Sequence, residues 1–139
     1  MITNDDSSNQ RNFKGSASRD IFKWAHKQFL PSNQYACDLD FVLVSKYPPG
    51  IAAFLDFKKP NDYITFSEVL AYNALIKIAP LYIVKAVNPE IGPFEISQYQ
   101  GGDWRTEPPV VELVNEFYCK DWAEFAQWEA RLRSGKGRE

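Results

Sequence analysis

The chain has 139 residues, a length typical of one domain, and 45% of them are hydrophobic and 24% charged. This composition excludes an intrinsically disordered chain and indicates a globular protein with a single core. The formal net charge of −2 does not favour a strongly basic nucleic-acid-binding protein, although a local basic patch can still meet phosphate.

The compartment is predicted from what the sequence lacks. The N-terminal residues are polar, without the apolar stretch of a signal peptide, and no apolar run reaches membrane length. Cys37 and Cys119 are far apart and belong to no CxxC or Cys/His cluster, so a zinc site is not expected. One disulfide and two free thiols both remain open. We expect a soluble cytoplasmic protein with no membrane partner.

The first elements are a flexible segment and a helix. Residues 1–18 are rich in Ser, Asn and Asp and are expected to be flexible. Apolar residues recur at helical spacing over residues 19–30, with Ser18 or Asp20 as the candidate N-cap and Pro31 as the end.

A hairpin and a second helix follow. The runs "DFVLV" and "IAAFLDF" flank the turn "YPPG", and neither alternates cleanly, which is typical of strands covered on both faces. Thr65 and Glu68 then have the spacing of a capping box, which opens an apolar helix that Pro80 ends. Tyr72 of this helix is expected in the core, and Glu68 is expected to serve the cap.

The rest of the chain reads as two strands, a loop and a last helix. "LYIVKAV" is typical of a buried parallel strand, "PFEISQYQ" of a more exposed strand, and "GGDWRTEPP" of a loop. An aromatic-rich helix is predicted over residues 110–133. The order is α/β around a mixed sheet, with one domain over residues 19–133 and a basic tail over residues 134–139.

The hairpin gathers charged side chains at its open end. A turn centred on Pro48 places Asp40 opposite Asp56 and Asp38 opposite Lys58, and opposed Cβ atoms lie roughly 4.5–5.5 Å apart. A turn centred half a residue later would place Asp40 opposite Phe57 instead.

Two opposed carboxylates favour a cation between them, since like charges destabilise a strand pair. Mg²⁺ (or Mn²⁺) binds through one or two carboxylates, waters and phosphate oxygens, and a neighbouring lysine can contact the phosphate. The pattern is therefore a minimal site for cutting a phosphodiester.

The residues "DFVLV", "FLDFKKP", "SEVLAYNALIKIAP" and "LYIVKAV" resemble the PD-(D/E)xK nuclease superfamily, which includes Holliday-junction resolvases. The resemblance covers about residues 19–88. It implies a restriction-endonuclease-like fold and a Mg²⁺-dependent nuclease acting on DNA, with RNA also open. A chain this small presents little surface to DNA, so we also expect a homodimer, which would give two sites and a longer groove.

The resemblance also implies residue roles. Asp40 matches the first acid of the motif, Asp56 the second and Lys58 the lysine, and the backbone carbonyl of Phe57 would be a further metal ligand. Asp20 is the nearest match to an acid that some members carry on the first helix. Asp38 and Lys59 are further candidates near the site, and Lys59 could equally be solvated.

Three other interpretations stay open. Charges at strand ends are commonly only solvated, with Asp56 paired to Lys58 or Lys59. The domain could keep the nuclease fold and bind nucleic acid or a protein without cutting. It could also be an interaction module that docks through the tryptophans of its last helix.

Overall fold

The computed structural model describes residues 17–31 and 35–134. The chain forms two compact units, residues 1–35 and residues 36–139, and each is described by itself. The predictions for a flexible N-terminal segment and for a basic tail fall almost entirely on residues outside the described ranges.

The first unit contains the predicted N-terminal helix, α1 (Ala17–Phe29). It begins before residue 19, so Ser18 and Asp20 lie inside the helix and the prediction that either is its N-cap was wrong. Asp20 occupies the first turn, where an acid interacts favourably with the helix dipole. The large apolar side chains of α1 are exposed, with Phe22 at 69% and Phe29 at 77% of full exposure.

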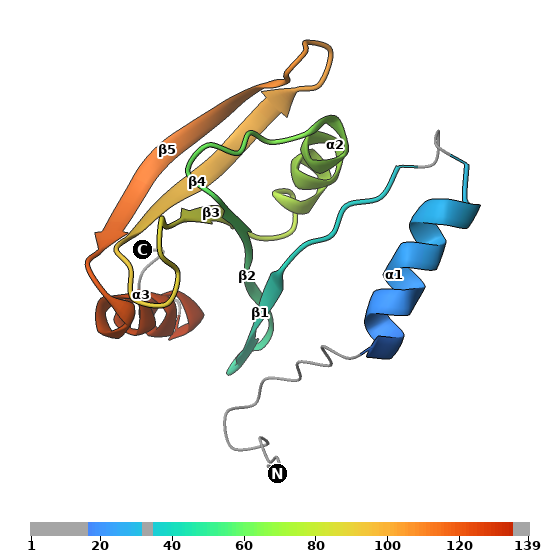
Figure 1. Ribbon diagram of the computed structural model, residues 1–139. Coiled ribbons are helices and arrows are strands. Elements are labelled where there is room, and N and C mark those ends of the chain that lie inside the picture. Colours follow the sequence, from blue (N-terminus) through green and yellow to red (C-terminus); the bar gives the residue numbers. More distant parts are fainter. Residues whose placement is uncertain (1–16, 32–34, 135–139) are drawn as a thin grey trace. The chain divides into compact units, whose positions relative to one another are not determined.

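The second unit is a five-stranded mixed sheet with two helices. Its elements are β1 (Phe41–Lys46), β2 (Pro49–Lys58), α2 (Phe66–Leu75), β3 (Leu81–Lys85), β4 (Phe94–Asp103), β5 (Val110–Cys119) and α3 (Trp122–Ser134) (Figure 1). The strands lie in the order β1-β2-β3-β4-β5. β2 and β3 are parallel, and the other neighbours are antiparallel. The predicted α/β class with a mixed sheet is confirmed.

The prediction of one helix over residues 110–133 was wrong in its first half. Residues 110–119 form β5, which pairs along its length with β4, and only the second half forms the aromatic-rich helix α3. Val110, Val111 and Val114 are β-branched and suit a strand. Pairing with β4 along the whole length of residues 110–119 gives this segment the hydrogen-bond partners of a strand.

The two helices pack against opposite faces of the sheet. On β2, Phe54 belongs to the cluster that includes Val69 and Tyr72 of α2, whereas Ala53 and Leu55 belong to the cluster of α3. This alternation follows from the two-residue period of a strand. The core therefore has two layers of side chains, one on each face of β2 and β3.

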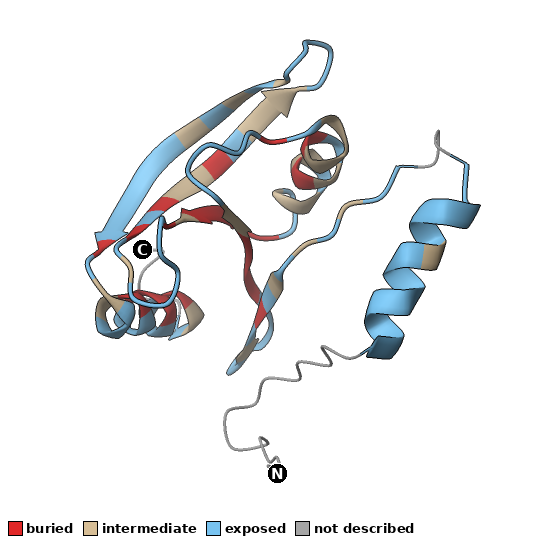
Figure 2. Ribbon diagram, viewed as in Figure 1, coloured by how far each residue is buried: buried red, intermediate tan, exposed pale blue. Residues whose placement is uncertain are grey.

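The two strands of the hairpin differ in burial, although the sequence predicts that both are covered on both faces. β2 is buried from Ala52 to Asp56, as expected for a central strand (Figure 2). In β1 only Leu43 is buried, and Val42 and Val44 are half exposed, so two-sided coverage of β1 was a wrong prediction. β1 is an edge strand of this five-stranded sheet and pairs with a strand, β2, on one side only among the described residues.

The register of the hairpin shifts once. Near the turn Lys46 pairs with Pro49, and between Leu43 and Val44 the register changes, which leaves Ala52 without a partner. This bulge makes the predicted Val44–Ala52 pair wrong. Beyond it the strands follow the predicted register, because a bulge inserts one residue into one strand. Within the described part of the chain, no helix is both long enough and apolar enough to cross a membrane.

Candidate functional site

The open end of the hairpin brings Asp40 and Asp56 together, as predicted. Phe41 pairs with Leu55, and the two aspartates are the next residues outward. The backbone N–H of Asp40 donates to Oδ1 of Asp56 at 3.2 Å, and the backbone N–H of Phe57 donates to Oδ2 of Asp40 at 2.8 Å. Each carboxylate thus accepts a hydrogen bond from the opposite strand.

The two aspartates differ in burial. Asp56 is only 3% exposed, whereas Asp40 is exposed. The pKa of Asp56 is raised from its ordinary 3.8 to about 7, mainly by burial and also by the nearby Asp40 carboxyl, whereas the hydrogen bond from the Tyr72 hydroxyl lowers it. The negative charge of Asp56 is therefore poorly compensated by the chain itself.

Tyr72 of α2 anchors the buried carboxylate. Its hydroxyl donates to Oδ2 of Asp56, and the ring is fully buried against Tyr99 with 5.1 Å between the ring centroids. Burial and the neighbouring Asp56 raise the pKa of Tyr72, so the hydroxyl stays protonated and acts as a donor. The prediction that Tyr72 is a core residue is confirmed, but its hydroxyl belongs to the site.

Lys58 is fixed by a carboxylate of α2. Its ammonium forms an ion pair with Oε2 of Glu68, and both side chains are largely buried, at 12% and 16% exposure. Oε1 of the same Glu68 accepts the backbone N–H of Thr65 at 3.0 Å, while Thr65 Oγ1 accepts the backbone N–H of Glu68 at 3.4 Å. The predicted capping box is confirmed, and Glu68 serves both the helix cap and the lysine.

Glu68 and Tyr72 were not assigned to the site from the sequence. They are four residues apart, so they share one face of α2. A helix directly after a strand that carries Asp56 and Lys58 would have to pack over that strand. The spacing of the two polar groups was therefore the signal that could have placed them.

The remaining predicted residues occupy different places. Asp38 is exposed, two residues before Asp40. Lys59 is exposed in the turn after β2. Phe57 pairs with Val84 of β3 and packs against the α3 side of the core. Asp20 belongs to α1 of the first unit.

The cysteines are two free thiols in the structure. Burial is the main cause that raises the pKa of each to about 11, which makes both poor nucleophiles at neutral pH.

The donor set fits a hard divalent cation. Asp40 and Asp56 offer carboxylate oxygens on neighbouring strands, because each carboxylate accepts a backbone N–H from the opposite strand. A carboxylate oxygen that accepts one hydrogen bond retains a free lone pair. Two carboxylates with water and phosphate are the usual ligands of Mg²⁺. Among residues 17–31 and 35–134, no cluster of three or more His, Cys, Asp or Glu side chains is suited to hold a metal ion.

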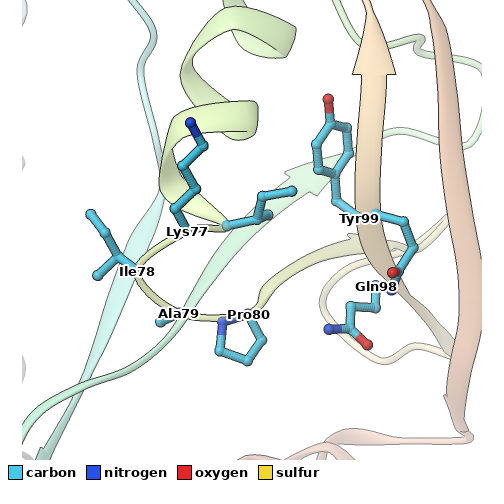
Figure 3. Close-up of a pocket in the computed structure, with 8 residues that line it drawn as sticks. Lys77, Ile78, Ala79, Pro80, Gln98 and Tyr99 are labelled. Carbon is cyan, nitrogen blue, oxygen red and sulfur yellow. The ribbon is translucent and has the colours of Figure 1, made fainter.

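Another pocket of the second unit lies away from these carboxylates. It has a volume of about 290 Å³ and is lined by Lys77, Ile78, Pro80, Gln98 and Tyr99 (Figure 3). It borders the start of β3, whereas Asp56 pairs with the middle of that strand.

Comparison of the chain with protein-family models, with curated proteins and with solved structures found no match in any of the three.

Proposed function

We propose that this protein is a metal-dependent nuclease that hydrolyses phosphodiester bonds in DNA, with a restriction-endonuclease-like arrangement of its α/β fold. The observation that carries the proposal is the contact between Asp40 and Asp56 at the end of the hairpin, with Lys58 two residues along the same strand. The resemblance of these segments to PD-(D/E)xK nucleases supports it.

The cation would be held by Asp40, Asp56 and the backbone carbonyl of Phe57. Bound Mg²⁺ or Mn²⁺ supplies Lewis acidity, which acidifies water and stabilises negative charge on a phosphate. A cation also removes the repulsion between the two carboxylates, one of which is buried. Binding of the cation therefore favours the ionised form of Asp56.

The chain's own groups position the reactants. The Lys58 ammonium donates to a non-bridging oxygen of the scissile phosphate, and Glu68 orients that ammonium through an ion pair. Tyr72 fixes the Asp56 carboxylate through its hydroxyl. In the reaction a water oxygen attacks phosphorus and releases one proton to solvent, the bond from phosphorus to the leaving oxygen breaks, and the leaving oxygen takes up one proton from solvent.

DNA is the proposed substrate because the resembling nucleases mostly cut DNA. A chain of 139 residues offers a short surface to a duplex. The proposal therefore includes a homodimer, in which a twofold axis supplies two sites along a longer groove. Sedimentation velocity at micromolar concentration measures the oligomeric state.

The first test is cleavage of linear, nicked, single-stranded and branched DNA with Mg²⁺, Mn²⁺ or EDTA. Asp56→Ala removes a proposed ligand, and Glu112→Gln removes a charge from an exposed position of β5 as the matched control. We expect metal-dependent cutting that Asp56→Ala reduces at least a hundredfold and Glu112→Gln leaves unchanged.

Absence of cutting on every substrate, together with Mg²⁺ and Mn²⁺ binding that Asp56→Ala does not weaken, would refute the nuclease. DNA binding without cutting would then favour a non-catalytic module.

A further inference from the structure

A second lysine, Lys85, lies beside Lys58 in the sheet. The two residues are paired positions of the parallel strands β2 and β3, and neighbouring strands lie about 4.7–4.9 Å apart. Ile83, two residues before Lys85, belongs to the cluster of Tyr72 from α2, so Lys85 points to the α2 face of the sheet. Lys58 points to the same face, because it pairs with Glu68 of α2. The two ammonium groups therefore belong to one surface.

This surface continues the acid site on the side away from β1. Asp56 is two residues before Lys58 on β2, and it points to α2 as well, because it accepts the Tyr72 hydroxyl. β2 lies between β1, which Asp40 directly precedes, and β3, which Lys85 ends. A strand of substrate that leaves the acids and crosses β2 towards β3 therefore passes Lys58 and then Lys85.

The two lysines differ in their counter-charges. Lys58 forms an ion pair with Glu68, whereas Lys85 is half-buried and forms no ion pair within residues 17–31 and 35–134. Glu95 of β4 is the residue paired with Lys85 on its other side, and it is exposed. The positive charge of Lys85 is therefore available to an anion from outside the chain.

A phosphate of the substrate strand fits this position. Each strand of DNA carries one negative charge per roughly 3.4 Å of helix axis, so a phosphate at Lys58 brings the next phosphate towards the neighbouring β-strand. The ammonium of a lysine binds phosphate as a point charge on a flexible stem, which suits Lys85. The carboxylate of Glu95, at the next paired position, repels a further phosphate.

We infer that Lys85 binds the phosphate next to the scissile phosphate, so that the protein holds two consecutive phosphates of one DNA strand. The inference rests on the proposed nuclease function. Two held phosphates fix the direction in which the strand crosses β2 and β3, and Glu95 turns the strand away from the sheet beyond them. A strand without a charged phosphate at this position is then a poor substrate.

The first test measures how DNA binding depends on salt. Fluorescence anisotropy in EDTA gives the affinity for one oligonucleotide between about 50 and 200 mM NaCl. We expect Lys85→Gln to weaken binding about tenfold at the lowest salt. The slope of log K against log salt should become shallower by about 0.7–0.9, which is the contribution of one phosphate contact. Lys85→Arg keeps the charge and should keep the slope.

Two further variants separate a phosphate site from a general effect of charge. Lys77→Gln is the matched control, because Lys77 is exposed and lies just before the start of β3, at the opposite end of that strand from Lys85. Glu95→Gln removes the acid beside Lys85 and should strengthen binding. An unchanged slope in Lys85→Gln would overturn the inference, and so would an equal change of slope in Lys77→Gln.

The second test places the contact relative to the cut. A neutral methylphosphonate replaces the phosphate on each side of the scissile one in turn. In the wild type we expect it to raise KM about tenfold on one side, and in Lys85→Gln on neither. Equal KM values for all three strands in the wild type would refute the second phosphate site.

Failure of this site is distinguishable from failure of the nuclease, because binding is measured without metal. Metal-dependent cutting by the wild type, with a salt slope that Lys85→Gln leaves unchanged, would refute only the site at Lys85. A slope that Lys85→Gln makes shallower, without cutting of any substrate, would support the phosphate contact and refute the nuclease.

Discussion

Replacing Asp56 by asparagine should stabilise the metal-free protein at neutral pH. The folded protein raises the pKa of Asp56 from 3.8 to about 7, chiefly because the side chain is buried. Between these values the unfolded chain has released a proton that the folded chain still holds. Stability of the wild type therefore falls as pH rises from about 4 to about 7, and is constant above that.

The magnitude follows from the two pKa values. Their difference corresponds to roughly 4 kcal/mol at about 1.36 kcal/mol per pH unit. Asparagine has one acceptor oxygen in place of two, so the hydroxyl of Tyr72 or the backbone N–H of Asp40 loses its acceptor, at a cost of about 1–3 kcal/mol. We expect a net gain of about 1–3 kcal/mol at pH 8, which shrinks as the pH falls and becomes a net loss of about 1–3 kcal/mol near pH 4, where only the cost of the lost hydrogen bond remains.

Urea unfolding in EDTA, followed by circular dichroism between pH 4.5 and pH 8, measures this difference. Glu112→Gln is the control, since its carboxylate lies at an exposed position of β5. An Asp56→Asn protein whose stability relative to wild type does not increase with pH would refute the reasoning. Addition of Mg²⁺ should then stabilise the wild type and leave Asp56→Asn unaffected, because the variant lacks one proposed ligand.

Three further predictions concern neighbouring groups. Tyr72→Phe removes a hydrogen bond that lowers the pKa of Asp56, so the apparent pKa of that carboxyl should rise when it is followed by NMR. An unchanged or lower pKa would contradict the contact between Tyr72 and Asp56. Asn73→Ala removes two hydrogen bonds of 3.1 Å to the backbone N–H and carbonyl of Gly102 in β4, and one of 2.7 Å from the Tyr99 hydroxyl. It should lower the free energy of unfolding by about 2–3 kcal/mol in urea titration. A loss below about 0.5 kcal/mol would refute the contribution of these bonds to stability. Cys37 and Cys119 should react slowly with Ellman's reagent at pH 8 and rapidly in urea, because both thiol pKa values are near 11; fast reaction of the native protein would disagree.

The parts of the fold that the sequence predicts are those with local causes. The capping box at Thr65 and Glu68 needs only residues three apart, and β3 is apolar at four successive positions. The contact between Asp40 and Asp56 could be predicted because a hairpin register depends on its turn, although the turn lies half a residue earlier than expected and a bulge restores the pairing.

The parts that were missed depend on tertiary contacts. Residues 110–119 form a strand because β4 is beside them, and their own pattern does not separate a strand from a helix. The four-residue spacing of Glu68 and Tyr72 indicates only that the two share one face of α2. The bond from Tyr72 to Asp56 also requires the packing angle of α2 on the sheet. The register predicted from the sequence placed Asp38 opposite Lys58, but Lys58 forms an ion pair with Glu68. This pairing depends on where α2 begins relative to the end of β2.

Because Glu68 both caps α2 and pairs with Lys58, local unfolding of the helix start also affects the proposed catalytic lysine. One oxygen closes the first turn of α2 and the other holds Lys58, so fraying of that turn withdraws the carboxylate from both partners at once. Amide exchange of Glu68, whose N–H is bonded to Thr65, would report this opening. The orientation of the ammonium is then only as persistent as the first turn of one ten-residue helix. Partly folded chains that have formed the hairpin but not this turn carry both aspartates and remain without an ordered lysine.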